Sequence, residues 1–431
     1  MAVILATTAI VYLHCIGNQF IGDQLGSIVF NRYLASWFYL PKALVNDDWW
    51  FDNPQHVPVS SYYRPILSLW LWINYHLFGI DPAGWHAAMI AVNLIVVWLV
   101  FRVCTVLSGD RDAGILSAML FALMPAHAEA VVFAFAPPIS AAFALGAFDL
   151  YLRRRAKILS LGLFACAMLS YESAVGFPVL IGAHALIFPS QVEIETDSRS
   201  NSIGEREGPE AGVASSVFRR LAAAFAETWP YGILVVLYLF LRMWIFGFVF
   251  EKSPPPYPTS NQVALTIPLA IVGYLKLLVM QWKAGPAHPQ IEYVISSAQP
   301  RFYFTIAALC GSLAVLAAVI GFSRHRWLYL YCILWFVITI APALNLNAIA
   351  GGPTVHDRFL YLPSMGFCLM AADLAVNFAR GGPMRAKIIR IGAVAVAIGY
   401  AAMLFSVQAY WKSASAMDHF RLDRLGGDSL L

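Results

Sequence analysis

The chain has 431 residues, of which 60% are hydrophobic and only 12% are charged, and its net charge is +4. Soluble domains usually carry about 25% charged residues, so a water-soluble fold is excluded. The basic residues lie in clusters between apolar runs and form no patch of the kind that binds nucleic acid. The six cysteines fall almost entirely inside apolar runs without metal-like spacing, so we expect reduced, lipid-buried thiols.

Long apolar runs recur along nearly the whole chain, each close to the roughly 20 residues that a spanning helix needs. They are too long and too evenly apolar for barrel strands, which predicts an all-α polytopic membrane protein. The first run lacks a basic n-region and a small-residue cleavage site, so we interpret it as a retained span. The predicted spans, about eleven in number, are residues 2–16, 84–105, 112–126, 137–152, 156–171, 174–189, 228–249, 301–322, 327–345, 357–379 and 388–409.

Four basic clusters orient the chain, because positive charge in short loops marks the cytoplasmic side. The clusters fall on one side only if two apolar segments, residues 65–78 and 263–282, do not cross. Both are predicted to be interfacial helices on the outer face, which leaves the N-terminus inside and the C-terminus outside. The clusters are Arg102 with Arg111; Arg153, Arg154, Arg155 and Lys157; Arg324 with Arg326; and Arg380, Arg385, Lys387 and Arg390.

This orientation predicts a transmembrane domain over residues 1–409, followed by a short outer tail at 410–431. A large first outer loop covers residues 17–83, and another long outer loop covers 250–300. Residues 190–225 are polar and mixed in charge, which predicts a mobile cytoplasmic loop. One elaborate outer loop facing several small ones is unusual for a channel and indicates chemistry at the outer face.

Two acidic segments of the first outer loop are candidates for chemistry. Asp23 follows the first span by a few residues, so its carboxylate is expected near the membrane surface, where it could act as a general base. An N-cap for a helical segment starting at Gln24 is the alternative. The run Asn46-Asp-Asp-Trp-Trp-Phe51, which contains Asp48, suits a sugar or a divalent ion, or else an interfacial anchor with a helix cap.

Two further segments place ionisable groups at the outer boundary. Arg64 opens the first interfacial helix at the depth of a lipid phosphate, which its planar guanidinium binds well, although headgroup anchoring is equally common. Pro65 suits the first helical turn. His127 and Glu129 end a span, and ionisable groups there are functional candidates, but their spacing argues against a shared metal site.

The last two candidates lie in a tight turn and at the start of a late span. Glu172 occupies the turn, where an acid is usually solvated. His356, Asp357 and Arg358 enter the predicted span at 357–379 from outside. Asp357 is expected to cap it, and Arg358 needs either a lipid phosphate or an acid from another loop.

Six motifs occur in an order that resembles the membrane part of the GT-C glycosyltransferases. They are similar to the transmembrane O-mannosyltransferases that carry tetratricopeptide repeats, and to their bacterial relatives. The resemblance covers nearly all of the chain and does not include the repeats. The motifs are Phe20-Ile-Gly-Asp23, Asp48-Trp-Trp, Tyr63-Arg-Pro, Pro125-Ala-His-Ala-Glu129, Tyr171-Glu-Ser, and Asp357-Arg-Phe-Leu-Tyr-Leu-Pro-Ser-Met-Gly-Phe367.

The resemblance implies a GT-C-like bundle that moves a sugar, a hexose such as mannose, from a polyprenyl phosphate to a hydroxyl of a protein or glycan. Transfer is expected to be inverting, with Asp23 as the base. It is expected on the extracytoplasmic side, either at the periplasmic face of a bacterial inner membrane or in the endoplasmic reticulum of a eukaryote. Membrane lipids are expected partners, and nucleic acid is not. Arginine or a divalent cation is expected to stabilise the negative charge of the phosphate. The expected donor-binding residues are Asp48, Arg64, His127, Glu129, Glu172, His356, Asp357, Arg358 and Tyr361.

The chain departs from this pattern at three places. Gln24 stands where relatives usually carry a second acid, residues 135–140 are uncharged, and Tyr171 replaces a common lysine. An inactive GT-C-like scaffold is therefore one alternative. A lipid-linked saccharide flippase is another, although it needs charges at mid-bilayer depth, whereas Asp149 and Asp373 lie toward cytoplasmic ends.

Overall fold

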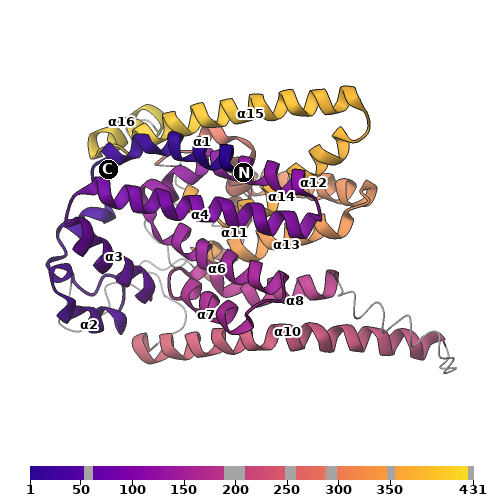
Figure 1. Cartoon of the computed structure of the whole chain (residues 1–431), viewed down its shortest axis with the longest axis horizontal. Helices are drawn as coiled ribbons and strands as arrows, with labels where there is room; N and C mark the ends of the chain where they lie inside the picture. Colours follow the sequence, from indigo (N-terminus) through magenta and orange to yellow (C-terminus); the bar gives the residue numbers. More distant parts are fainter. Residues whose placement is uncertain are drawn as a thin grey trace.

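The computed structural model describes residues 1–52, 62–188, 209–247, 259–286, 288, 299–346 and 355–425, and these parts are helical with no strand (Figure 1). Each segment predicted to span contains a helix. These helices are α1 (Ala2–Leu13), α4 (Pro82–Ser108), α5 (Arg111–Leu123), α6 (Ala136–Leu152), α7 (Lys157–Met168), α8 (Phe177–Ile187), α10 (Pro209–Phe246), α12 (Pro300–Phe322), α13 (Arg326–Ile340), α14 (Ser364–Ala379) and α15 (Pro383–Tyr410). The other α-helices are α2 (Leu40–Leu44), α3 (Pro65–Phe78), α11 (Ser260–Val279) and α16 (Ala414–Leu425).

Aspartate and proline begin many of these helices. Asp81 caps α4 and Pro82 occupies its first turn, where the missing N–H costs nothing. Asp110 caps α5 by accepting hydrogen bonds from the amides of residues 112 and 113. Between them Gly109 ends α4 in the left-handed conformation, at φ 66°, that glycine adopts readily. Short turns of this kind let consecutive spans pack antiparallel.

Six helices among the described residues are long and apolar enough to cross a membrane. There are seven if α5 and the segment Pro125–Ala134, bent by 59° at their junction, form one span. The protein is therefore an integral, multi-pass α-helical membrane protein, as predicted. α3 has 14 residues, whereas α11 has 20 and also suits a span, so the interfacial placement of α11 stays a prediction, as does the count of eleven.

Helix α4 lies inside the bundle, and α12 and α15 lie at its surface. Half of the most apolar window of α4 is buried, compared with 6% for α12 and for α15. Figure 1 shows α15 along one edge, α10 along the opposite edge and α4 between them. Large apolar side chains on the outer helices, such as Phe304, Phe322 and Ile391, are exposed, so these faces contact lipid.

One predicted loop is partly wrong. Helix α10 begins at Pro209, so the second half of the segment 190–225 is helical and not a mobile loop. Its sequence after residue 217 is rich in leucine, alanine and arginine, which are strong helix formers. Residues 189–208 of that segment lie outside the described residues, as do residues 248–258, 287 and 289–298 of the outer loop predicted over 250–300.

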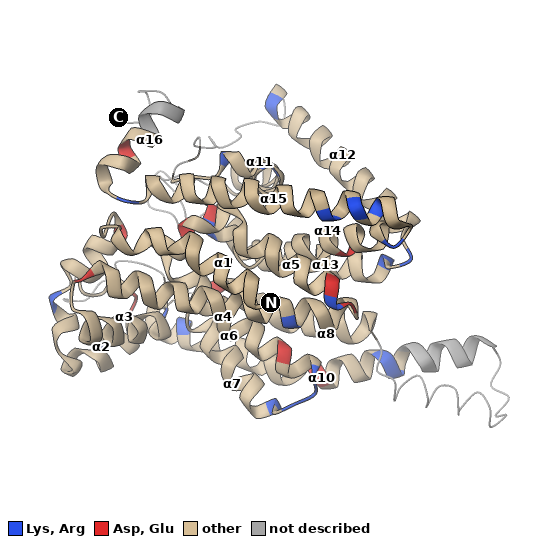
Figure 2. Cartoon of the chain, turned by 45° about the horizontal axis from the view of Figure 1, so that its top comes forward, with Lys and Arg blue, Asp and Glu red and all other residues tan. Residues whose placement is uncertain are grey.

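Figure 2 shows several basic residues near the start of α15, and ion pairs link two of the other basic clusters to acidic partners. The Asp149 carboxylate accepts hydrogen bonds from Arg102 at 2.6 Å and from Arg153 at 2.9 Å. Arg154 pairs with Glu227 of α10 at 2.8 Å. These contacts bring the C-terminal halves of α4 and α6 together with the first half of α10.

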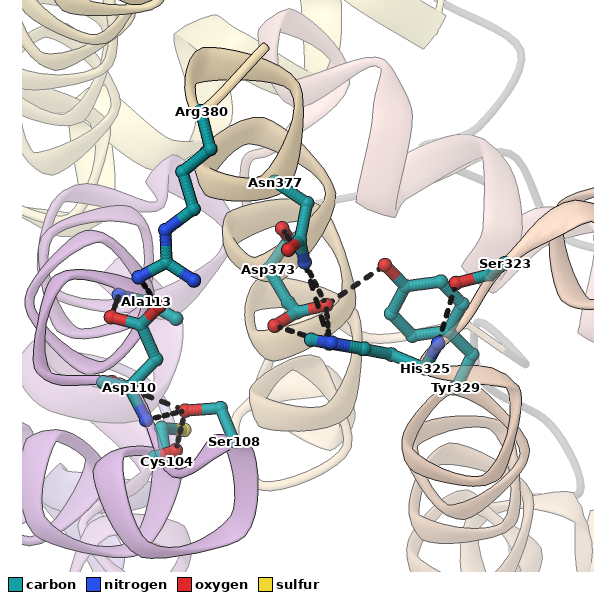
Figure 3. A network of polar contacts seen from close by, with 10 residues as sticks. All are labelled: Cys104, Ser108, Asp110, Ala113, Ser323, His325, Tyr329, Asp373, Asn377 and Arg380. Atoms are coloured by element: carbon teal, nitrogen blue, oxygen red, sulfur yellow. Dashed lines mark hydrogen bonds and ion pairs between the residues drawn. The ribbon is translucent and has the colours of Figure 1, made fainter.

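A second pair of contacts joins the later loops to the same end (Figure 3). Arg380, after α14, pairs with Asp110, between α4 and α5. Asp373 of α14 accepts hydrogen bonds from the Tyr329 hydroxyl at 2.8 Å and from Asn377 at 2.9 Å, and the His325 Nδ1 lies 2.9 Å away. The four basic clusters thus occupy one end, which is the arrangement that the predicted cytoplasmic side requires.

Candidate functional site

A cavity of about 380 Å³ lies at the opposite end of the bundle. Helix α4 has 27 residues and is about 40 Å long, and Arg102 near its C-terminus marks the basic end. Near its N-terminus, Trp85 stacks on Phe135, a cavity-lining residue, at 6.4 Å between ring centroids. The charged residues that line the cavity are Asp23, Asp48, Arg64, Glu172, Arg242 and Arg358.

Arg64 stands at the centre of a three-membered charge cluster. Its Nε donates to both carboxylate oxygens of Glu172, at 3.1 and 3.2 Å, and its Nη2 donates to Oε2 at 2.8 Å. Its Nη1 donates to Oδ2 of Asp48 at 3.3 Å. The guanidinium also lies over the rings of Tyr62 and Tyr171, at 4.2 and 4.8 Å from their centroids. Two carboxylates and two aromatic rings therefore hold this side chain.

The electrostatics of this cluster favour an ionised state for Arg64. Its side chain is only 14% exposed, and burial disfavours the cation, but Glu172 and then Asp48 raise the pKa of Arg64 above its ordinary value. One cation facing two carboxylates leaves the cluster with a net charge of −1. All three guanidinium nitrogens of Arg64 donate to these acids, so this residue first of all joins two outer segments.

Main-chain contacts hold the cluster in place. Arg64 precedes α3, with Pro65 at the first helical position as predicted. The Ile66 amide donates to the Leu169 carbonyl at 3.0 Å, and the Asp48 amide donates to the Tyr62 carbonyl at 3.0 Å. These bonds fasten the first outer loop to the turn that bears Glu172, which is 23% exposed at its side chain and not freely solvated.

Arg358 reaches the cavity from the 3₁₀ turn η11 (Asp357–Leu360), before α14 begins at Ser364. Its main-chain amide donates to Oε2 of Glu129 at 2.9 Å and its Nη1 donates to Oε1 at 3.1 Å. The Nδ1 of His356 lies 3.5 Å from the same carboxylate. Of the two partners that the sequence left open for Arg358, the acid from another loop is therefore present.

Asp357 does not cap a helix, so that expectation is wrong. Its carboxylate is fully buried and accepts hydrogen bonds from the Gly285 amide at 2.7 Å, while the His288 Nε2 lies 2.7 Å from its other oxygen. The preceding residue, His356, is extended, and this directs Asp357 toward the segment after α11 instead of toward the next turn. Asp357 thus ties two outer segments together beside the cavity.

Asp23 lines the cavity with an exposed side chain. The residue before it, Gly22, has φ 50°, and a Cβ there would meet the Phe133 ring at 3.2 Å, so glycine permits both the turn and the close packing. The cap of the following turn is Gln24, and no side chain caps that turn, so Asp23 is not an N-cap. Burial disfavours the Arg358 cation, but Glu129, Tyr171 and Asp23 raise the pKa of Arg358.

Gln24, one of the departures from the family pattern, has a structural task. Its amide nitrogen donates to the carbonyls of Val132 and Phe133, at 3.2 and 3.1 Å, and its amide oxygen accepts from the Ile21 amide at 3.2 Å. The side chain is 4% exposed. A carboxylate cannot donate to two carbonyl oxygens, so a neutral amide fits this position and an ionised acid does not.

His127 and Tyr361 do not line the cavity. His127 Nε2 lies 2.9 Å from the Ser364 hydroxyl, and its ring packs on Phe121 and on Tyr361, at 4.4 and 4.8 Å. The Tyr361 hydroxyl donates to Asn93 at 2.6 Å. Both are buried in the core beneath η11, where they support the segment that carries Arg358.

Among the lining residues that sequence reasoning missed, two bear on the charges of the cavity. Arg242 lies inside a predicted span, and an arginine in an apolar run is itself a signal of function. Tyr171 was noted only as a replacement for lysine, yet its ring covers the Arg64 guanidinium. No pattern in the sequence indicates that contact, because the two residues are more than 100 positions apart.

The candidate site offers charge of both signs. Three acids and three arginines line the cavity. In the part of the chain that the structure describes, no group of three or more His, Cys, Asp or Glu side chains is arranged to hold a metal ion. A divalent cation thus remains an expectation from the sequence, without assigned ligands.

Fold and cavity together define a polytopic all-α membrane protein with a charged cavity at one end of its bundle. No protein-family model matches the chain. Relatives with names do match it, and they belong to the group that the sequence motifs predicted. Protein O-mannosyl-transferase Tmtc3 of Drosophila melanogaster is 25% identical over 81% of this chain and 43% of its own length. Tmtc1 of the same organism is 24% identical over 85% and 50%, and TMTC3 of Homo sapiens is 25% identical over 82% and 40%. The chain thus spans half or less of the length of these relatives.

Proposed function

We propose that this protein transfers a sugar, mannose by analogy with the names of its relatives, from a polyprenyl phosphate to a hydroxyl group of a protein or glycan. The observation that carries the proposal is one cavity that brings together Asp23 and Arg358, from opposite ends of the sequence, at the end of the bundle away from the basic clusters. The relatives are named O-mannosyl-transferases, which supports the sugar and the reaction class.

Asp23 is the general base in this proposal. Its carboxylate takes the proton of the acceptor hydroxyl while the hydroxyl oxygen attacks the anomeric carbon from the face opposite the phosphate. The bond between the anomeric carbon and the phosphate oxygen breaks as the new bond forms, so configuration inverts. An exposed carboxylate at the cavity lining is accessible to an incoming acceptor.

The leaving group is a phosphate that is already anionic, so it requires positive charge and not a proton. Arg358 supplies that charge at the cavity, and Glu129 holds the Arg358 main chain and guanidinium together. Arg64 contributes chiefly by fixing Asp48 and Glu172 around the cavity. The apolar lining residues Leu67, Leu71 and Leu239 suit the first isoprene units of the donor.

The two alternatives differ in what they require. A flippase needs charges along its path, whereas Asp149 and Asp373 are held by neighbouring side chains at the basic end. An inactive scaffold drew part of its support from Gln24, and the two carbonyls that Gln24 binds give that residue a structural reason. We therefore favour the active transferase.

The test is Asp23→Asn in the purified full chain, assayed with polyprenyl-phosphate mannose and a peptide acceptor rich in serine and threonine. Loss of the base should reduce turnover by roughly 10²–10⁴-fold. Asp52→Asn is the matched control, because Asp52 is an exposed acid of the same loop outside the cavity lining. Near-normal turnover of Asp23→Asn would exclude Asp23 as the base and implicate Asp48. An unmodified protein that is inactive with every lipid-linked donor would favour the scaffold.

A further inference from the structure

Two tryptophans stand next to each other in the first outer loop, and the structure gives them different surroundings. Trp50 is 4% exposed and packs on Tyr33, at 4.9 Å between ring centroids, so it belongs to the core of the loop. Trp49 is half-buried and lines the cavity that also contains Asp23 and Arg358. The sequence left a sugar, a divalent ion and an interfacial anchor open for this segment. An anchor would face lipid, so the position of Trp49 at the cavity favours a bound ligand.

Main-chain and ring contacts hold Trp49 in place. Its amide donates to Oδ1 of Asp47 at 3.0 Å, and its carbonyl accepts from the Asp52 amide at 3.0 Å. The ring of Phe51 lies 5.4 Å from the Trp49 ring between centroids. A side chain that the protein already holds loses little entropy when a ligand contacts it, so Trp49 suits the wall of a preformed site.

Gly26 lets the Trp49 ring lie beside the proposed base. Gly26 belongs to the helical turn η2 (Leu25–Val29), three residues after Asp23. A Cβ at Gly26 would come within 2.8 Å of the Trp49 ring, which is closer than a real contact, so glycine is needed for the indole to reach this position. The Ser27 hydroxyl donates to the Asp23 carbonyl at 2.8 Å and holds the turn. The indole and the Asp23 carboxylate thus belong to one wall of the cavity.

An indole beside a carboxylate is a suitable surface for a sugar ring. One face of a hexopyranose carries C–H groups, and the negative face of an aromatic ring attracts such hydrogens. The hydroxyl groups at the edge of the sugar need hydrogen-bond acceptors and donors, and the carboxylates and guanidinium groups that line this cavity are of both kinds. A cavity of about 380 Å³ also lies within the usual range for small-molecule sites.

We infer that the transferred sugar of the donor stacks on Trp49, so that its anomeric carbon and the acceptor hydroxyl meet near Asp23. This subsite rests on the proposed function, since it places the sugar of that reaction. The ligand chemistry is a hexopyranose ring. A glycan acceptor is the other source of such a ring, and the experiment separates the two.

The experiment measures binding to the purified full chain in detergent micelles. The probes are polyprenyl-phosphate mannose and polyprenyl monophosphate of equal chain length, and the quantity compared is the affinity for the first relative to the second. Trp49→Leu should reduce this relative affinity by roughly three- to tenfold and leave the affinity for the monophosphate unchanged. Trp49→Phe, which keeps an aromatic face, should retain part of it. Gly26→Ala should reduce it as well, because the added methyl group displaces the indole. Trp37→Leu is the matched control, since Trp37 is a 46% exposed tryptophan of the same loop outside the cavity lining.

An unchanged relative affinity in Trp49→Leu would overturn the assignment. Unchanged donor binding together with weaker binding of a mannose disaccharide would place the acceptor on Trp49 and would overturn it too. If Trp49→Leu fails to fold, Trp49→Phe and Gly26→Ala decide, because full relative affinity in both would exclude the subsite. Sugar-dependent binding through Trp49 in a protein that transfers no sugar would refute the proposed function alone. Transfer by the unmodified protein, with full relative affinity in Trp49→Leu, would refute this subsite alone.

Discussion

Removal of the Arg64 guanidinium should destabilise the outer half of the protein, and the structure allows the effect to be estimated. Arg64→Met keeps much of the side-chain volume but leaves Asp48 and Glu172, which both bind one guanidinium, without their shared cation. Two carboxylates left facing each other within a few ångströms repel by an energy on the order of a few kcal/mol at an effective dielectric constant of about 20. Breaking a buried ion pair by removing one partner generally costs about 3–5 kcal/mol. We therefore expect a loss of about 3 kcal/mol in the free energy of unfolding.

A loss of stability distinguishes this role of Arg64 from donor binding alone. An Arg64 that only held the donor would affect binding and leave stability nearly unchanged. Because its charge is shared by two acids of the protein itself, stability should fall even without donor. Arg64→Lys should be intermediate, since an ammonium keeps the charge but cannot donate in parallel to both Glu172 oxygens.

A double-mutant cycle measures this coupling. Unfolding of the unmodified protein, Arg64→Met, Glu172→Gln and the double variant is followed in mixed micelles by near-ultraviolet circular dichroism. Glu172→Gln removes one of the two negative charges, so it should restore a large part of the stability lost in Arg64→Met. Effects that add within about 0.5 kcal/mol would refute the reasoning, because independent sites behave in that way.

Two other predictions follow from particular contacts. Gln24→Glu should lower the free energy of unfolding by about 1–3 kcal/mol at neutral pH, because an ionised acid would face the carbonyls of residues 132 and 133. This loss should shrink as the pH falls, because the new carboxyl takes up a proton. A loss of stability that does not depend on pH would contradict this. Single cysteines at Arg154 and Arg380 should react with an impermeant maleimide only from the cytoplasmic side, and one at Asp52 only from the outer side; external labelling at Arg154 would refute the orientation.

The class of fold could be read from the sequence. Apolar runs near 20 residues exclude barrel strands, and a helix occupies each predicted span, because a chain in lipid must satisfy its backbone hydrogen bonds locally. Pro65 marked a helix start for the same local reason. The basic clusters were predicted to share one side, and contacts such as Arg380 with Asp110 gather them at one end.

The candidate site depended on tertiary structure. Sequence motifs pointed to Asp23, Arg64, Glu172 and Arg358, but their partners come from elements far apart in the chain, and a local pattern carries no information about such pairs. The sequence left open whether Arg358 meets a lipid phosphate or an acid, and packing of the Glu129 segment beneath η11 decided it. Asp357 was expected to cap a helix, yet the approach of Gly285 and His288 determined its role.

Burial likewise separated residues that are equivalent in the sequence. His127 and Glu129 lie two positions apart in one motif, but the first is enclosed by Phe121 and Tyr361 and the second reaches Arg358. Arg242 was hidden in an apolar run whose hydropathy predicted only a span. Its place at the cavity follows from how α10 packs across the bundle. The sequence by itself therefore determined which segments are helices and which end is basic, because both depend on local composition. Only the tertiary structure decided which charges meet, because an ion pair depends on distances that packing sets.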